Sequence, residues 1–156
     1  MRSNPQAVNE TRLRVRYAET DQMGVVYHAN HLIWFEVGRV ELLRQLGFSY
    51  RDMESKDNLF FAVAEAKCRY RAPVRYDDEV LIRTQLLNVR ESVVHFGYEL
   101  RRGEDGALLA EGETTHIVTN AAMKITEIPD KYMNVFRQAV GKTQSKSLKT
   151  GNRTII

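Results

Sequence analysis

The segment from Tyr17 to Asn30 (YAETDQMGVVYHAN) concentrates the side chains of this chain that could do chemistry. It places the carboxylate of Asp21, the flexible Gly24 and the histidine His28 just ahead of a long apolar stretch with helical spacing. A helix N-terminus presents unpaired backbone N–H groups and the positive end of the helix dipole. N–H groups around His28 would then face the Asp21 carboxylate. Acyl transfer needs this combination of an oxyanion stabiliser and a base or nucleophile.

Spacing alone leaves a second interpretation of Asp21 open. Aspartate, threonine and asparagine ahead of a helix most often cap it or form a turn. Asp21 is far from the expected helix start, so Asn30 is the predicted N-cap. That distance favours the catalytic role of Asp21 only slightly, and the turn-forming role stays beside it.

The remaining reactive side chains carry weaker hypotheses. His28 and His31 have a metal-like spacing, but no third ligand with suitable spacing accompanies them, so no metal site is predicted. His95 and His116 fall within strand patterns, which favours hydrogen-bonded structural roles. Cys68 is the single cysteine, which excludes an intrachain disulfide and a four-cysteine zinc site. Its small neighbours indicate that it packs as a small hydrophobe.

Two elements flank the reactive segment. Residues 12–17 alternate arginine with apolar side chains, the period of a half-buried strand. Residues 32–46 have apolar side chains at helical spacings over so wide a stripe that we expect the helix to be enclosed on several sides. Gly38 inside this helix indicates a close approach to a sheet, and Gly47 is placed to end it in a left-handed C-cap.

After a short polar link, β-type runs dominate and are joined by turns of hairpin length. The predicted strands are residues 59–72, 79–90, 93–102 and 107–119, followed by a short helix at 130–140. In the first of these strands, small side chains share one parity: Ala62, Ala64, Ala66 and Cys68. Tight turns imply antiparallel neighbours. The expected fold is α+β, a hot-dog fold in which an antiparallel sheet wraps one long central helix.

Length and charge bound the remaining expectations. The 156 residues predict a flexible lead-in at 1–10, one domain at 11–140 and a flexible basic tail at 141–156. The net charge is +3 and the pI about 9.1, but no nucleic-acid motif accompanies the basic residues, so no nucleic-acid partner is predicted. No membrane span, signal peptide or cofactor motif is present, which favours a cytoplasmic protein. An uncovered sheet edge predicts a homo-oligomer.

The string Thr-Asp-x-x-Gly-Val-Val-Tyr-His-Ala-Asn at 20–30, followed by Trp-Phe-Glu and an arginine, resembles the 4-hydroxybenzoyl-CoA thioesterase-like family of hot-dog proteins. The similarity runs from about residue 14 to 120. It implies an acyl-CoA thioesterase that releases free acid and CoA without a cofactor. Asp21 maps onto the catalytic carboxylate, and the backbone N–H of His28 onto the group that polarises the thioester carbonyl. The matching positions that would bind substrate are Gly24, Val25, Tyr27 and Asn30.

The resemblance also implies homodimers or homotetramers with sites at subunit interfaces and an apolar tunnel for the acyl chain. His31 departs from the family pattern, in which an aromatic residue is commoner. His28 is frequent in the acyl-CoA branch, which favours an aliphatic acyl substrate. Two rivals remain: a hydratase or dehydratase acting on enoyl-CoA or acyl carrier protein, and a non-catalytic acyl-CoA-binding hot dog.

Overall fold

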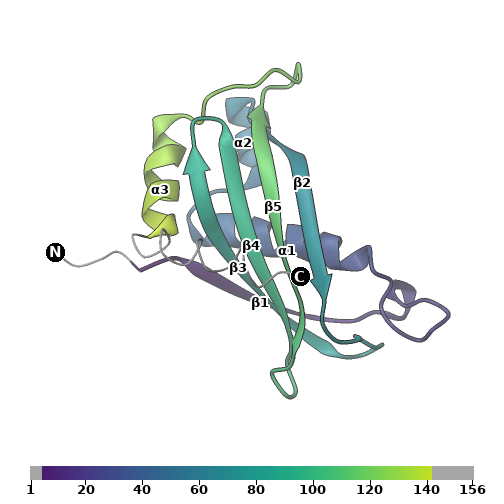
Figure 1. The fold of residues 1–156 in the computed structure, drawn as a ribbon. Helices are drawn as coiled ribbons and strands as arrows, with labels where there is room; N and C mark the ends of the chain where they lie inside the picture. Colours follow the sequence, from purple (N-terminus) through teal and green to yellow (C-terminus); the bar gives the residue numbers. More distant parts are fainter. Residues whose placement is uncertain (1–4, 142–156) are drawn as a thin grey trace.

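A five-stranded antiparallel sheet crossed on one face by a long helix forms the molecule (Figure 1). The computed structural model describes residues 5–141. The strand order is β1-β3-β4-β5-β2, with bounds Val8–Arg14, Phe60–Tyr70, Glu79–Arg90, Val93–Arg102 and Leu108–Thr119 for β1 to β5. The helices are η1 (Tyr17–Glu19), α1 (Asn30–Gln45), α2 (Tyr50–Asp57) and α3 (Asp130–Val140). This arrangement confirms the predicted α+β hot-dog fold.

The second half of the chain folds as its patterns predict. The strands β3 and β4 and the helix α3 have the expected bounds, and β5 begins one residue later than expected. The link between β3 and β4 is short because Glu91 adopts a left-handed conformation with φ of 45°. The tail from residue 142 onward lies outside the described residues.

The first strand begins earlier than the prediction of residues 12–17. β1 starts at Val8 and pairs with β3 from Val8 opposite Gln85 to Arg14 opposite Glu79. Residues 8–10 of the expected lead-in therefore belong to the sheet. The alternation of apolar and polar side chains does not extend to residues 8–10, because polar side chains lie on both faces of this end of β1. Beyond Arg14, the chain leaves the sheet and turns into η1.

α1 begins two residues earlier than predicted and buries one side only. Trp34, Phe35 and Leu42 are buried against the sheet, whereas Ile33 is 53% exposed. The prediction of a helix enclosed on several sides is therefore wrong for the single chain. Gly47, with φ of 99°, ends the helix as a left-handed C-cap, as predicted.

The expected approach of the helix to the sheet is confirmed at Gly38. A Cβ placed on Gly38 would collide with the hydroxyl of Thr84 and lie 2.8 Å from Cγ2 of Ile82. Nearby, Phe35 stacks on Tyr98 of β4 with ring centroids 4.3 Å apart. Only a residue without a side chain lets α1 lie this close to β3. The core lies between α1 and the sheet, and α2 and α3 add Met53 and Phe136 to it.

The helix α2 occupies what was predicted as a polar link. Ser49 caps it, its Oγ accepting a hydrogen bond from the N–H of Asp52 at 3.2 Å. Met53 is its one buried side chain. With so little apolar surface, the sequence of this helix has no amphipathic period to reveal it.

β2 forms one edge of the sheet and contains an irregularity. Its register against β5 shifts between Val63 and Glu65. Ala62 therefore faces the opposite side of the sheet from Ala66 and Cys68, although all three have the same parity in the sequence. A bulge cannot be seen in the alternation pattern, because it moves every later side chain by one position.

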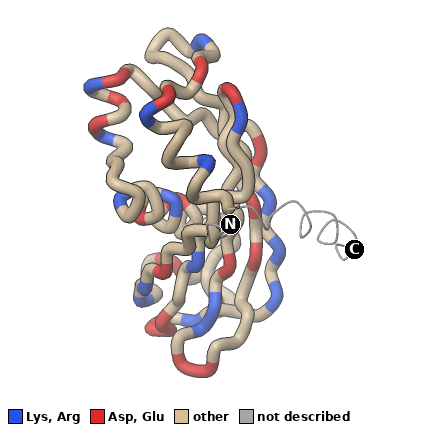
Figure 2. Tube along the Cα trace, turned by 90° about the vertical axis from the view of Figure 1, so that its left-hand side faces the viewer, with Lys and Arg blue, Asp and Glu red and all other residues tan. Residues whose placement is uncertain are grey.

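Positively and negatively charged residues are interspersed along the described chain (Figure 2). Several arginines of the outward strand positions pair with carboxylates, including Arg71 with Glu111 and Arg102 with Asp105 at 3.0 Å. The basic strand residues are thus largely matched by acids. No helix among residues 5–141 is long and apolar enough to cross a membrane.

Candidate active site

The reactive segment forms a tight loop between η1 and α1. Thr20 and Val26 form an isolated antiparallel bridge, which holds the two limbs of the loop side by side. Within it, the Asp21 N–H donates to the Val25 carbonyl at 2.9 Å, and the Gly24 N–H donates to the Asp21 carbonyl at 3.0 Å. Gly24 has a φ of 77°, the left-handed conformation expected of a glycine here. Asp21 and His28 therefore lie on opposite limbs of one short loop.

The Asp21 side chain is half-buried and only partly satisfied. Its Oδ1 accepts a hydrogen bond from the Met23 N–H at 2.8 Å. Its second oxygen, Oδ2, accepts no hydrogen bond within the described residues. The carboxylate is therefore held in a turn and also keeps an acceptor for a substrate or water. The turn-forming and catalytic interpretations of Asp21 are compatible.

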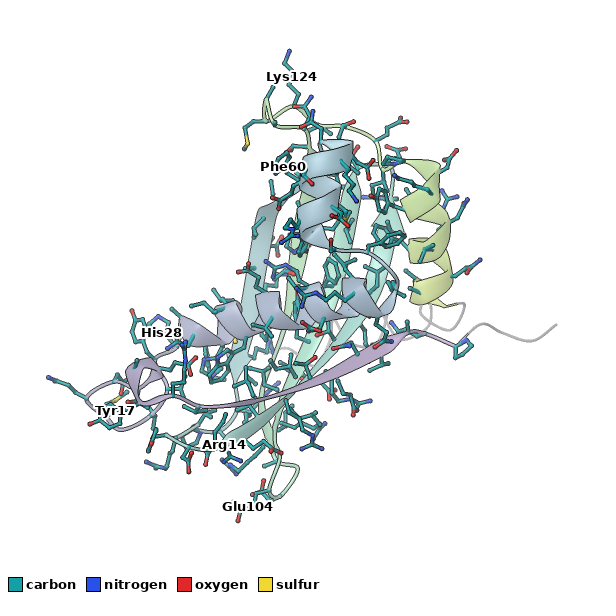
Figure 3. The ribbon with its side chains drawn as sticks, turned by 180° about the vertical axis from the view of Figure 1, so that it is seen from behind. Arg14, Tyr17, His28, Phe60, Glu104 and Lys124 are labelled. Carbon is teal, nitrogen blue, oxygen red and sulfur yellow. The ribbon has the colours of Figure 1, made fainter. Side chains whose placement is uncertain are left out.

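The other limb presents the start of α1 (Figure 3). The Tyr27 carbonyl accepts from the Asn30 N–H at 3.0 Å. This carbonyl and the His28 N–H belong to the same peptide group, and hydrogen bonds in series polarise one another. The His28 N–H itself has no hydrogen-bond acceptor in the part of the chain that the structure describes. The His28 residue as a whole is exposed.

Asn30 does not cap the helix, so that prediction is wrong. The N-cap position is Ala29, which supplies no side-chain hydrogen bond. The Asn30 amide nitrogen instead donates to the backbone carbonyl of Glu19 at 2.8 Å. Because the helix starts at Asn30 itself, its side chain reaches sideways to η1. The first turn of α1 is consequently left without a side-chain cap.

Glu19, which the sequence did not single out, is a buried carboxylate beneath this loop. Its exposed fraction is 6%, and its Oε2 accepts from the Trp34 indole N–H at 2.8 Å. Burial acts against the charged form. The hydrogen bonds from the Arg16 backbone, from Trp34 and from the Arg16 side chain outweigh it and hold the pKa of Glu19 below its ordinary value. Glu19 is therefore an ionised carboxylate.

Tyr70 brings the edge strand β2 to the same place. Its hydroxyl donates to the His28 carbonyl at 2.8 Å, and its ring packs edge-on against His31 at 4.7 Å. Burial first, and then the neighbouring Cys68, raise the pKa of Tyr70 to about 12, so it remains a donor. Tyr70 and His28 are 42 positions apart in the sequence, and no local pattern indicates that they meet. The role of Tyr70 could therefore not have been predicted.

His31 lies buried between Trp34 and Tyr70. Burial lowers its pKa, and its Nδ1 faces the His28 carbonyl at 3.1 Å, which favours the neutral ring with a proton on Nδ1. Among residues 5–141, no group of three or more histidine, cysteine or acidic side chains could hold a metal ion. His31 instead packs beneath the helix start.

The other predicted side chains have the structural roles expected of them. His95 pairs with Glu113 at 3.4 Å, and His116 Nε2 lies 2.8 Å from the Thr114 hydroxyl. Cys68 is half-buried, and burial raises the pKa of its thiol. Of the remaining predicted site residues, Val25 forms the loop's backbone bond to Asp21, while Tyr27 is 49% exposed and its ring lies 4.4 Å from that of His28.

A family model described as the thioesterase-like superfamily matches residues 15–136, a range that begins just after β1, includes the loop and ends within α3. The chain belongs to this superfamily. The acyl-CoA thioester hydrolase YbgC of Escherichia coli O157:H7 is 32% identical over 127 residues, covering 81% of this chain and 93% of YbgC. The protein YneP of Bacillus subtilis strain 168 is 38% identical over 110 residues, covering 70% of this chain and 78% of YneP.

Among solved structures, the chain is similar to a DHNA-CoA thioesterase from Staphylococcus aureus. The TM-score is 0.77 at 32% sequence identity, and the match covers 96% of each chain. Membership in the superfamily confirms the resemblance drawn from the Thr-Asp-x-x-Gly string. It also supports the fold, because the family model matches four of the five strands of the sheet as well as the loop.

Proposed function

We propose that this chain is an acyl-CoA thioesterase in which Asp21 is the catalytic carboxylate and the His28 N–H stabilises the oxyanion. One observation carries the proposal: a carboxylate with one oxygen that accepts no hydrogen bond and a backbone N–H that donates none, within residues 5–141, share one loop at the start of α1. Family membership supports the reaction class, and the name of the relative YbgC supports the substrate class.

The chemistry needs no further group. The thioester carbonyl would accept a hydrogen bond from the His28 N–H while its carbon is attacked. Asp21 acts either as a base that takes a proton from the attacking water or as the nucleophile itself, forming a mixed anhydride that water then cleaves. In both routes the C–S bond breaks, and the CoA thiolate takes up a proton. In both routes negative charge develops on the carbonyl oxygen, where one donor is typically worth about 2.7–4 kcal/mol.

The loop also supplies the surroundings of the reacting atoms. Gly24 and Val25 shape the turn beside Asp21, and Tyr27 lies over the His28 ring. We propose that these residues contact the thioester end of the substrate. The Asn30 side-chain amide donates one hydrogen bond to the Glu19 carbonyl, and we propose that its remaining polar groups face the substrate. An aliphatic acyl group remains the proposed substrate, and hydrolysis rates across aliphatic and aromatic acyl-CoAs test it.

The assembly proposed for this enzyme is a homodimer formed through β2, or a pair of such dimers. β2 is an edge strand of 11 residues whose outer edge has no partner in the described chain. Beside it, Leu32 and Ile33 of α1 are exposed apolar side chains. Pairing β2 with a second copy would satisfy the edge and cover this surface. The single cysteine is compatible with the proposed cytoplasmic location.

The Asp21→Asn variant tests the catalytic assignment. Asparagine keeps an oxygen that can accept from the Met23 N–H, so the turn and the fold are retained. It can neither take a proton nor attack a carbonyl. We expect kcat for acyl-CoA hydrolysis to fall at least about a thousandfold, in the range found when a catalytic group is removed. Release of CoA thiol measures kcat, and thermal unfolding measures the fold.

Asp130→Asn is the matched control, since Asp130 is an exposed residue in the first turn of α3, away from the loop. It should hydrolyse acyl-CoA like the wild type. Wild-type turnover in Asp21→Asn would disprove the assignment of Asp21. Hydration of an enoyl-CoA without thiol release would favour the dehydratase rival, and tight acyl-CoA binding without either reaction would favour the binding protein.

A further inference from the structure

We propose that Glu19 is a positioning residue whose buried carboxylate fixes the distance between Asp21 and the start of α1. The inference rests on the proposed function, because it concerns the geometry of that site. Glu19 ends η1, two residues ahead of Asp21, and is 6% exposed. It touches neither the Asp21 carboxylate nor the His28 N–H, and therefore acts through the backbone that carries them.

The side chain of Glu19 ties two elements together. Its Oε1 accepts from the Arg16 backbone N–H at 2.8 Å and lies 3.4 Å from the Arg16 Nε. Its Oε2 accepts from the Trp34 indole at 2.8 Å. Arg16 is the residue that leads out of the sheet, and Trp34 is in the second turn of α1. The carboxylate is therefore the link between the incoming chain and the helix.

The backbone carbonyl of Glu19 closes the same loop from the other side. It accepts from the Tyr27 N–H at 2.9 Å and from the Asn30 side-chain amide at 2.8 Å. Tyr27 and Asn30 flank His28. Glu19 thus connects the segment that leads to Asp21 with the segment around His28 and with the first two turns of α1. Displacement of Glu19 would change the separation of the two reacting groups.

Only an ionised carboxylate fits the side-chain site. Every group facing the two oxygens of Glu19 is a donor: the Arg16 N–H, the Arg16 guanidinium and the Trp34 indole. Glutamine has the same shape but carries an NH2 in place of one oxygen. In either orientation that NH2 would point at another N–H, either that of Arg16 or that of Trp34. Glu19→Gln therefore removes at least one hydrogen bond and adds a repulsion, with almost no change in volume.

The predicted consequence lies in kcat, because a misplacement of about 1 Å at a reacting group can cost on the order of 100-fold in rate. We expect Glu19→Gln to lower kcat for acyl-CoA hydrolysis by roughly 10- to 100-fold. The KM should stay within about threefold of the wild type, because Glu19 is not in contact with the bound substrate. Amide hydrogen exchange in residues 20–28 should quicken, while exchange in β3 and β4 stays at the wild-type rate.

A double-mutant cycle with Trp34→Phe separates positioning from a general loss of stability. Phenylalanine removes the indole donor, so the glutamine NH2 no longer meets an N–H on that side. Glu19→Gln should then lower kcat by a smaller factor than it does in the wild-type background. Met53→Ala, a buried change in α2 away from the loop, is the control for stability and should keep the wild-type kcat.

Four outcomes would count against the inference or limit it. A wild-type kcat in Glu19→Gln, with Asp21→Asn inactive, would overturn the positioning role and leave the proposed function standing. An equal loss of kcat in Met53→Ala would also overturn it, since loss of stability would then suffice. If the wild type releases no CoA, both the proposed function and the catalytic part of this inference are refuted. Unchanged exchange in residues 20–28 of Glu19→Gln would then refute the remaining part, the structural clamp.

Discussion

At the scale of single residues, His116 shows what burial does to a titratable group outside the candidate site. It is fully buried in β5, between the rings of Phe61 and Phe96. Its Nε2 faces the Thr114 hydroxyl, while its Nδ1 has no partner in the described structure. Burial first, and then the positive charge of Arg39, lower the pKa of His116 to about 3. The folded protein therefore holds this ring neutral.

This makes His116 a source of acid sensitivity. The unfolded chain protonates it near its ordinary pKa of about 6.5, whereas the folded chain does so only near 3. Between these values the unfolded state binds one more proton, so stability falls as the pH falls. His116→Phe should reduce the slope of the unfolding free energy between pH 6 and 4 by up to about 1.4 kcal/mol per pH unit.

Urea unfolding at a series of pH values measures this slope. Phe96→Leu is the control, because it alters packing against His116 without removing a titratable group. It should shift the unfolding midpoint at every pH and keep the wild-type slope. If His116→Phe also keeps that slope, His116 does not cause the acid sensitivity.

The residues of the candidate site differ in how far the sequence could predict them. The sequence places Asp21 and His28 near each other because the strand, the loop and the helix start are consecutive, and the catalytic roles proposed for them come from the family resemblance. Asn30 was assigned the wrong role, since the choice between capping its own helix and bonding to Glu19 depends on where η1 lies. Tyr70 reaches the site from an edge strand, through a contact that only the folded sheet creates.

At the scale of elements, the position of α1 on the sheet depends on Gly38. Its neighbours on β3 are the side chains of Thr84 and Ile82, both buried. The helix could be predicted from its apolar spacing, and its close approach from the glycine inside it. Neither α2 nor the bulge of β2 could be predicted in this way, because α2 has one buried side chain and a bulge interrupts the period on which the prediction depends.

Gly38→Ala tests the close approach. Alanine favours the helix by roughly 1 kcal/mol over glycine, but its methyl group would collide with Thr84 and crowd Ile82. Overpacking of this kind typically costs about 1–3 kcal/mol. We therefore expect a net loss of unfolding free energy in urea titrations. In a Thr84→Ala background, which removes the colliding hydroxyl, the loss should be smaller. A Gly38→Ala protein more stable than the wild type would show that α1 has room to move.

At the scale of the whole molecule, the sheet of the described chain ends in two edge strands, β1 and β2, and β2 lies beside exposed apolar side chains. The outer edge of β2 is unpaired, and the exposed apolar side chains near it come from both β2 and α1, with Val63 at 56% and Ile33 at 53% exposed. Tyr70, which holds the His28 carbonyl, lies on the same strand. A second copy pairing along β2 would therefore cover the apolar surface and adjoin the candidate site. The prediction of a homo-oligomer rests on this edge.

Ile33→Glu tests that assembly. A glutamate in an apolar interface must lose its hydration without a partner, which opposes association. We expect the wild type to sediment as a dimer or larger at micromolar concentration, and Ile33→Glu to shift to the mass of one chain. Gln138→Glu adds the same negative charge at an exposed position of α3, which packs on β3, and should leave the β2 pairing intact. A monomeric wild type, or an Ile33→Glu protein that stays associated, would contradict pairing through this surface.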